Sequence, residues 1–331
     1  MDLGIILGDC PLEISERDQF NGMLRQVEAA QQAGVNYIVI GQHYMFSGAR
    51  WLQPVPVLAR LAAEVDPSTR LCTQVLVGPL HHPVALGEEL ATLDVVTDGR
   101  LIVGLGLGYL PREYDVFGVP FTERGRRLSE IIEILRIMWS KDSLNYDGRH
   151  YQFRDVPVTT HPVQESGPPI WVGASGEAGV RRAARLGDGW PIRPQEKPED
   201  LPGIVGAYYA ARREAGRSPG LPVPLRREVM LGAGHQDALA RARRLAGPYY
   251  ATMATARADG RVDVIEDFWV LGSPDECVAQ LRQISGSASV NPVITRANWP
   301  GMSADESVDY IRELGRNLVP ALREVNPMAP R

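Results

Sequence analysis

Residues Thr69–Gly118 read TRLCTQVLVGPLHHPVALGEELATLDVVTDGRLIVGLGLGYLPREYDVFG, and their pattern indicates the fold class. Leu71–Val77 is an apolar, β-branched run that predicts a fully buried parallel strand, which the following Gly-Pro pair ends. Apolar residues at helical spacing then run from about 84 to 96. Leu101–Val103 opens a second buried strand. The stretch is therefore one strand–helix–strand unit.

Further units of this kind flank the stretch on both sides. The eight predicted strands are Leu3–Gly8, Asn36–Gly41, Leu71–Val77, one opening at Leu101–Val103, Ile170–Gly173, Asp188–Ile192, Leu225–Leu231 and Val290–Ile294. The predicted helices cover about 17–33, 55–64, 84–96, 123–139, 177–186, 201–214, 274–284 and 304–322. This alternation predicts a (β/α)8 TIM barrel with insertions, as a single domain over 1–331. An open doubly wound sheet is the alternative fold.

The insertions between these units are less informative about fold and function than the units themselves. Asp147-Gly148 between alternating residues predicts a hairpin. The segment Asp237–Trp269 is helical at first and then hard to place. Because Tyr44–Gln53, Asn145–Val163 and Ala246–Trp269 contain no readable recognition pattern, the sequence does not name a substrate.

Composition excludes several classes of function. With 331 residues, 44% of them hydrophobic and 23% charged, the chain can bury a large core. A net charge of −5 argues against nucleic acid as a partner. No apolar run reaches about 18 residues and no signal peptide pattern is present, so we expect a cytoplasmic protein without membrane contact. The three cysteines have no spacing for disulfides or metal, and Cys72 reads as a buried hydrophobe.

In a TIM barrel, function lies on the loops that follow the strands. That rule selects His43, Gln74–His82, Gly106–Glu113, Ala174–Glu177, Trp190–Arg193 and Arg296–Trp299. His43 directly follows the second strand, where it is either a proton donor or acceptor or a rim histidine with satisfied hydrogen bonds. Aromatic residues on the same face predict either an apolar pocket or core packing. They are Tyr44, Phe46, Trp51, Tyr109, Trp190 and Trp299.

Three motifs have competing interpretations. Gly104–Gly108 is similar to a dinucleotide fingerprint, but its third glycine comes one place early and Pro111 interrupts before any regular helix begins. We interpret it as a close approach of backbone to a flat ligand ring or a tight barrel rim. Ala174–Glu177, before a helix, is either a phosphate loop or an ordinary helix start. His81-His82 has no further ligands nearby, so no metal site is predicted.

Several segments resemble the bacterial luciferase-like flavin-dependent oxidoreductases and together cover most of the chain in order. They are GVNYIVIGQHYMF, TRLCTQVLVGPLHHPVALGEELATLDVVTDGRLIVGLGLGY, REYDVFGVPFTERGRRLSEIIEILRIMW, PPIWVGASGEAGVRRAARLGDGW and LGSPDECVAQL. The resemblance implies a TIM-like barrel, usually dimeric. It also implies that FMN or the deazaflavin coenzyme F-420 binds at the carboxyl ends of the strands.

Carried over residue by residue, the resemblance implies that His43 assists the oxygen chemistry. It implies a cis peptide and bulge at Gln74-Val75, behind the flavin ring. The remaining implied cofactor contacts are Gly106, Leu107, Gly108 and Tyr109 for the ring and ribityl chain, Ala174, Ser175, Gly176 and Glu177 for the phosphate, and also Tyr151 and Trp190.

The sequence departs from luciferase itself at two positions. Leu107 replaces an arginine that helps to hold the phosphate, which leaves the phosphate mainly to the Ser175-Gly176 backbone. Gly106 stands where luciferase has a cysteine, so light emission is not expected.

The preferred hypothesis is a monooxygenase that uses reduced FMN from a separate flavin reductase, together with O2, to oxygenate a small, largely apolar substrate. In it, His43 manages protons and Arg296 orients an anionic group of the substrate. We expect a homodimer. One alternative is a coenzyme F-420-dependent oxidoreductase that transfers hydride without O2. Another is a non-catalytic flavin-binding or interaction protein.

Overall fold

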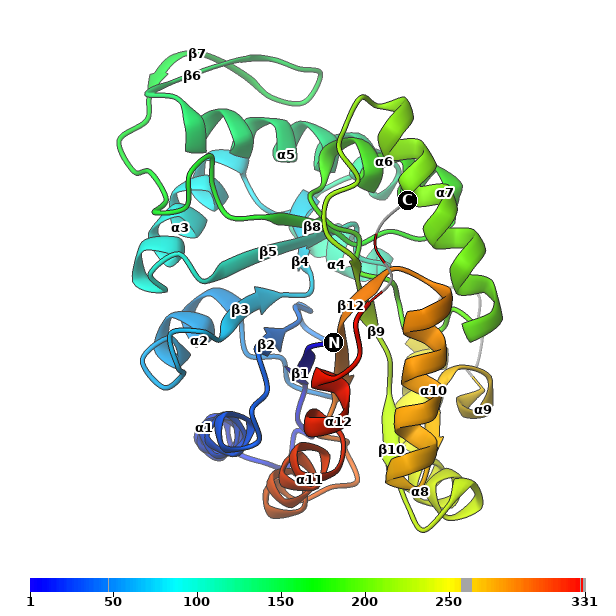
Figure 1. Ribbon diagram of the computed structural model, residues 1–331. Coiled ribbons are helices and arrows are strands. Elements are labelled where there is room, and N and C mark those ends of the chain that lie inside the picture. The colour runs from blue at the N-terminus through cyan, green and yellow to red at the C-terminus, as the bar shows by residue number, and fades with distance from the viewer. Residues whose placement is uncertain (47, 257–263, 328, 330–331) are drawn as a thin grey trace.

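The computed structural model describes residues 1–46, 48–256, 264–327 and 329, and its central parallel strands are surrounded by helices (Figure 1). The strands of the ring are β1 (Leu3–Leu7), β2 (Tyr37–Ile40), β3 (Arg70–Thr73), β4 (Leu76–Val77), β5 (Leu101–Gly106), β8 (Ile170–Val172), β9 (Val223–Arg226) and β12 (Val290–Arg296). β1 lies between β2 and β12, and the order continues from β2 through β3 and β5 to β8.

A short segment closes this sheet into a barrel. Gly189 pairs with Trp171 of β8, and Ile192 pairs with Leu225 of β9, both in the parallel sense. The N–H of Val172 donates to the carbonyl of Gly189 at 2.9 Å. Because β9 pairs with β12 and β12 with β1, the ring is complete. The predicted (β/α)8 barrel is confirmed.

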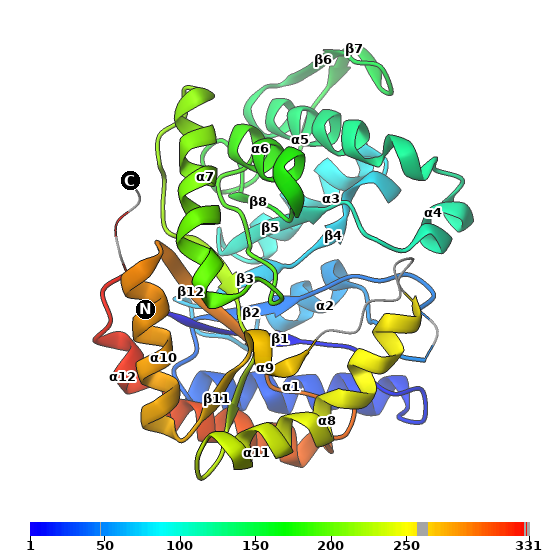
Figure 2. The same cartoon turned by 90° about the vertical axis from the view of Figure 1, so that its right-hand side faces the viewer.

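Helices cover the outside of the ring, as Figure 2 shows from a second direction. They are α1 (Glu16–Gln32), α2 (Pro54–Leu61), α3 (Pro83–Val96), α5 (Arg124–Ser140), α6 (Gly176–Leu186), α7 (Leu201–Glu214), α10 (Pro274–Ser287), α11 (Ala304–Asn317) and α12 (Val319–Arg323). Short 3-10 turns lie at Gly78–Leu80, Phe121–Glu123 and Pro198–Asp200. Within the described ranges, no helix combines the length and the apolar character needed to cross a membrane.

Other elements extend from the barrel. β6 (Ser143–Asp147) and β7 (Gln152–Pro157) form the predicted antiparallel hairpin. β10 (Val229–Leu231) pairs in parallel with β11 (Val270–Gly272). Between them lie α8 (His235–Ala256) and α9 (Ile265–Phe268), while α4 (Pro111–Phe117) follows β5. Figure 2 shows α4 and the end of α8 on the side opposite the N-terminus, where the carboxyl ends of the barrel strands meet. Residues 257–263 of the predicted 246–269 insertion lie outside the described residues.

Several sequence expectations need correction. The third strand is broken between β3 and β4, and the seventh divides into β9 and β10. The sixth is reduced to two isolated bridges. The helix expected over 304–322 divides into α11 and α12 at Leu318. Pro111 does not prevent a helix: it opens α4, since the first helical position needs no N–H donor. β11 was not predicted, because three residues are too few for a periodic signal.

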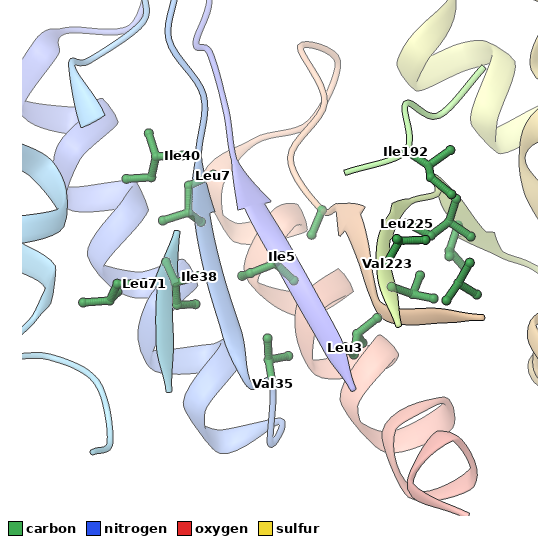
Figure 3. Close-up of a cluster of buried hydrophobic side chains, with 14 of the residues drawn as sticks. Leu3, Ile5, Leu7, Val35, Ile38, Ile40, Leu71, Ile192, Val223 and Leu225 are labelled. Atoms are coloured by element: carbon green, nitrogen blue, oxygen red, sulfur yellow. The ribbon is translucent and has the colours of Figure 1, made fainter. Parts of the chain in front are cut away.

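Side chains alternate along the strands between the barrel interior and the helices. Ile6, Val39, Cys72, Ile102, Trp171 and Ile294 form the interior cluster. Their neighbours in sequence pack outward into the main core, as Leu3, Ile5 and Leu7 of β1 do beside Ile38 and Ile40 of β2 (Figure 3). Burial on both faces explains why these strands read as continuous apolar runs.

Glycines hold the inward positions at the carboxyl ends of several strands. Gly8, Gly41, Gly106 and Gly173 each occupy the alternation step that points into the barrel. A Cβ on Gly106 would lie 2.5 Å from Val75 Cγ2, and one on Gly8 would lie 2.3 Å from Arg296 Nη2. The barrel mouth is therefore lined by backbone and by a few large side chains from neighbouring loops.

Gly104 gives a direct test of this packing. Thr73 Oγ1 accepts from the N–H of Gly104 at 2.7 Å and donates to its carbonyl at 2.9 Å, and a Cβ would lie 2.0 Å from Thr73 O. We expect Gly104→Ala to lower the free energy of unfolding by about 2 kcal/mol or more. The control Gly206→Ala, in an open position of α7, should raise it by roughly 0.5–1 kcal/mol. Urea denaturation measures both, and equal stability of Gly104→Ala and wild type would contradict the packing argument.

Candidate functional site

His43 lies at the carboxyl end of the barrel, three residues beyond β2. Its Nδ1 is 3.1 Å from Glu113 Oε1, and its Nε2 is 3.2 Å from the hydroxyl of Tyr109. The side chains of His43 and Glu113 are 11% and 2% exposed. Since a carboxylate can only accept, Nδ1 carries the proton of the neutral ring and Nε2 is left as the acceptor. His43 is thus held in the form that a proton acceptor needs.

Glu113 belongs to the first turn of α4 and has no role in the sequence-based interpretation. The same oxygen that faces His43 accepts the backbone N–H of Tyr44 at 2.7 Å. Glu113 Oε2 is buried and has no hydrogen-bond partner among the described residues. The loop rule selects 106–113, so an acid in the loop after β5 is a usable signal. The sequence contains no signal for the pairing of this acid with His43, which lies 70 positions away.

Aromatic rings surround His43. The centroid of the imidazole lies 5.5 Å from Phe46, 4.9 Å from Trp51 and 5.3 Å from Tyr109, the last two edge-on. The other three predicted aromatics lie elsewhere: Tyr44 packs on Phe117, Trp190 donates to the carbonyl of Ala174, and Trp299 stacks on Trp269. Only Phe46, Trp51 and Tyr109 of the set therefore lie around His43, although Tyr44 and Trp190 each line a different cavity.

The Gln74-Val75 peptide is cis, as the resemblance implied. It lies in a bulge: between the paired rows Cys72–Ile102 and Leu76–Leu105, the β3–β4 side contains one residue more than β5. The bulge turns the side chain of Val75 toward Gly106 and Gly173, whose added Cβ atoms would lie 2.5 and 3.1 Å from it. Val75 and the two glycines therefore form a smooth apolar surface, which fits a flat ring.

The loop after β5 continues this surface. Gly108 has a φ of 65°, and a Cβ there would lie 2.8 Å from Val77 Cγ1. The carbonyl of Leu107 accepts the hydroxyl of Tyr114, which fixes the loop. Tyr109 is 40% exposed and reaches from this loop to His43. Gly106, Leu107, Gly108 and Tyr109 thus lie together beside the bulge.

The start of α6 fits a phosphate. Ser175 is its N-cap residue, yet its side chain makes no capping hydrogen bond, so the hydroxyl and the first N–H groups can both face a ligand. A cavity of about 610 Å3 opens here, within the size range of small-ligand sites. Ser175, Gly176, Glu177, Arg181, Trp190 and Arg193 contribute to its lining. Arg181 lies 3.0 Å from the carboxylate of Glu177 and offsets its charge.

Two predicted site residues lie apart from this group. Tyr151 is next to β7, where its N–H donates to Glu130 and its ring contacts His82. Arg296 is 1% exposed at the end of β12 and pairs with Asp9 of the loop after β1. Burial lowers the pKa of Arg296, but Asp9, Tyr249 and Glu228 together raise it by more, so the guanidinium stays charged. The sequence interpretation missed Asp9, although it directly follows the first strand pattern.

The adjacent histidines face different partners. His81 Nε2 lies 3.2 Å from Gln42 Oε1 and 3.3 Å from the Tyr44 hydroxyl, whereas the ring of His82 contacts Tyr151 and Phe153. Burial lowers the pKa of His81 to about 4, so it is neutral near pH 7. In the described part of the chain, no group of three His, Cys, Asp or Glu side chains is arranged to hold a metal ion.

Comparisons with known proteins agree with the fold. The family model described as luciferase-like monooxygenase matches residues 1–290. A crystal structure of a monooxygenase from Streptomyces bottropensis superposes with a TM-score of 0.86 at 26% identity, over 97% of this chain and 100% of that one.

Curated relatives differ in their cofactors. The oxygenase component of a flavin-dependent trigonelline monooxygenase from Acinetobacter baylyi is 27% identical over 60% of this chain and 55% of its own length. A coenzyme F-420-dependent hydroxymycolic acid dehydrogenase from Mycobacterium tuberculosis is 25% identical over 93% of this chain and 86% of its own length. The chain spans 62% of the length of the first curated relatives it matches.

The half-buried His81 gives a prediction for the pH dependence of stability. Its pKa of about 4 in the fold is below the ordinary 6.5, so the unfolded chain binds more protons at mildly acidic pH. The stability that this group contributes is therefore complete above pH 6.5 and lost as pH falls toward 4, by about 3 kcal/mol in all. We expect His81→Gln to lose less stability than wild type between pH 7 and 4 in urea titrations. Parallel losses in the two proteins would show that His81 is not responsible.

Proposed function

Because the chain belongs to the luciferase-like monooxygenase family, we propose that it is a flavin-dependent monooxygenase acting on a small, largely apolar organic substrate. Reduced FMN from a separate reductase and O2 are its co-substrates in this proposal. The observation that carries it is His43, held by Glu113 beside the surface of Val75 and Gly106. A proton-transfer group next to a platform for a flat ring is what such a reaction requires.

The residues that would hold the cofactor lie on two sides of the site. Val75, Gly106 and Gly173 would support the flavin ring, and the loop Ser175-Gly176 would bind the phosphate. When bound, reduced FMN supplies the electrons with which O2 is activated. Leu107 and Tyr109 would contact the ring and the ribityl chain, as the family resemblance implies.

The protein's own part in the reaction is proton transfer and exclusion of water. His43 Nε2 can accept or return a proton, while the Glu113 carboxylate fixes the ring and stabilises its protonated form. A substrate that binds His43 would replace the hydroxyl of Tyr109, which now donates to Nε2. Phe46 and Trp51 cover the imidazole and limit the entry of water.

A second candidate function uses coenzyme F-420 and hydride transfer. The His43–Glu113 pair favours it equally, since a base of this kind can take the proton of an alcohol while hydride leaves its carbon. The dehydrogenase relative that matches 93% of the chain also supports it. The same platform and phosphate loop would serve either cofactor.

Anaerobic titrations separate the two candidates. We expect reduced FMN to bind at least tenfold more tightly than oxidised coenzyme F-420, measured by calorimetry on the purified protein. Gly286→Ala, in an open position of α10 that lines neither the platform nor the cavity beside α6, is the control for both ligands. Tight binding of coenzyme F-420 with no binding of reduced FMN would reject the monooxygenase proposal in favour of the second candidate.

Glu113→Gln tests the role of the pair. Gln keeps an acceptor for the Tyr44 N–H but loses the charge that stabilises protonated His43, so we expect kcat to fall by roughly 100-fold with KM little changed. His43→Gln should lose at least as much. The measurement is product formation from a panel of small apolar compounds with reduced FMN and air, followed across pH 6–9. Glu133→Gln, on the outer helix α5, alters a hydrogen bond from Tyr146 of β6 and should behave like wild type. Unchanged turnover and pH profile in Glu113→Gln would contradict the proposed role.

A further inference from the structure

Arg296 carries hydrogen-bond donors that the fold does not use. Its Nη2 pairs with Asp9, and its backbone N–H donates to Glu228 Oε2 at 3.0 Å. Its Nε and Nη1 are buried and have no hydrogen-bond partner among the described residues. Buried donors without partners cost stability, especially on a charged group, and are rare in proteins. Their retention here therefore needs an explanation.

More unpartnered polar atoms follow directly in the sequence. Within the described chain, Trp299 Nε1 and Asn298 Oδ1 are also buried without hydrogen-bond partners. Three of these four atoms are donors, and all four lie at or just beyond the end of β12, where the carboxyl ends of the barrel strands meet. The guanidinium lies 5.0 Å from the ring of Trp299, so the two residues are neighbours. Neighbouring donors on one loop are suited to an oxygen acceptor of a ligand.

A second buried arginine shows what a purely structural role looks like. Arg227, also fully buried, donates through its terminal nitrogens to the carbonyls of Pro194, Glu196 and Phe268. Only its Nε lacks a partner among the described residues, and the side chain ties three segments together just beyond β9. Within the same described residues, the side chain of Arg296 makes no such set of backbone contacts. Arg227 therefore joins segments of the chain, whereas Arg296 presents donors at the carboxyl end of the barrel.

The charges around Arg296 balance. Asp9 pairs with Arg296, and Glu228 pairs with Arg226 at 2.7 Å while its other oxygen accepts from the Arg296 backbone. Two cations and two anions leave no excess positive charge for a ligand. A carboxylate placed against Arg296 would lie near two buried carboxylates and be repelled. A neutral acceptor meets the same donors without that repulsion.

We propose that Arg296 and Trp299 form a carbonyl-binding subsite, so that the substrate is an apolar compound bearing a ketone, lactone or quinone oxygen. This inference rests on the proposed function and names its substrate class. β1 separates β2, which leads to His43, from β12, which ends at Arg296. Both residues therefore lie at the carboxyl end of the barrel, on opposite sides of β1. The subsite replaces the anionic group expected from the sequence, because the sequence did not show Asp9 as a partner.

Tyr249 of α8 covers this subsite. Its ring lies 4.6 Å from the guanidinium carbon of Arg296 and packs edge-on against Trp299. A ligand oxygen reaches Nε and Nη1 once this ring turns aside. The apolar body of the ligand then takes the place of the ring, among Tyr250, Trp269 and Trp299. Tyr249→Ala should therefore keep the preference for carbonyl ligands and increase affinity for all of them.

The test uses three probes with one skeleton: 2-acetylnaphthalene, 2-ethylnaphthalene and 2-naphthoate. Binding to the purified protein is followed by quenching of tryptophan fluorescence, without turnover. We expect the ketone to bind about tenfold more tightly than the ethyl compound, as one or two added hydrogen bonds would give. The carboxylate should bind more weakly than the ketone. Equal binding of ketone and ethyl compound, or tightest binding of the carboxylate, would overturn the proposal.

Variants assign the preference to individual residues. Arg296→Lys keeps a charge beside Asp9 but loses the planar donors, so the ketone should bind no better than the ethyl compound. Arg227→Lys, the matched control, should keep the tenfold preference. Asp9→Asn leaves a net positive charge, so binding of 2-naphthoate should rise at least tenfold relative to the ketone. A ketone preference that survives Arg296→Lys, or no gain for 2-naphthoate in Asp9→Asn, would overturn the proposal.

Titration of reduced FMN into the same variants keeps the two proposals apart. Normal FMN binding together with no ketone preference rejects the subsite alone. If the wild-type protein does not bind reduced FMN, the proposed function is rejected, whatever the naphthalene probes show.

Discussion

The contact of Val75 with the backbone of Gly106 and Gly173 is the constraint on which the site depends. A parallel barrel normally fills its interior with alternate side chains from every strand. In this barrel the lower layer is filled by six side chains, among them Trp171 and Ile102, but the layer at the carboxyl ends is largely glycine. One bulged strand supplies the valine that replaces the missing side chains. The barrel therefore ends in a shallow apolar floor, and the loops above it provide the polar groups.

The polar groups come from loops that are far apart in the chain and joined by single buried residues. Glu113 joins the loop after β5 to the loop after β2 by accepting from both His43 and the Tyr44 backbone. Asp9 joins the loop after β1 to the end of β12 through Arg296. In each case a carboxylate orients a nitrogen-bearing side chain whose remaining atoms face the mouth. The two pairs flank β1 on opposite sides, so the floor has a proton-transfer side and a hydrogen-bond-donor side.

The sequence predicted the barrel because its signals are local. Runs such as Leu3–Leu7 and Ile170–Val172 are apolar on both faces, and Ser273 with Glu276 forms the expected capping box of α10. The loop rule located His43 and the start of α6 for the same reason. The partners Glu113 and Asp9 required knowledge of which loops meet, and no spacing encodes that. Likewise, a three-residue strand such as β11 is defined by its pairing with β10 and not by its own pattern.

FMN and coenzyme F-420 would contact the apolar surface of Val75, Gly106 and Gly173 in the same way. They would differ at the cavity beside α6. A flat ring needs Val75 and the glycines whether it is a flavin or a deazaflavin, so these positions cannot discriminate. The cavity beside α6 is where the two cofactors differ, since coenzyme F-420 carries a longer acidic tail beyond its phosphate. That cavity contains Arg181 and Arg193, but their charges are offset by Glu177 and Glu196. Glu214 also lines this cavity, so the cavity has no excess positive charge. It therefore favours a ligand with one phosphate over one with an extended polyanionic chain, because each added carboxylate would have to displace an internal ion pair. These electrostatic grounds support the proposal of FMN as the cofactor, whereas His43 suits oxygenation and hydride transfer alike.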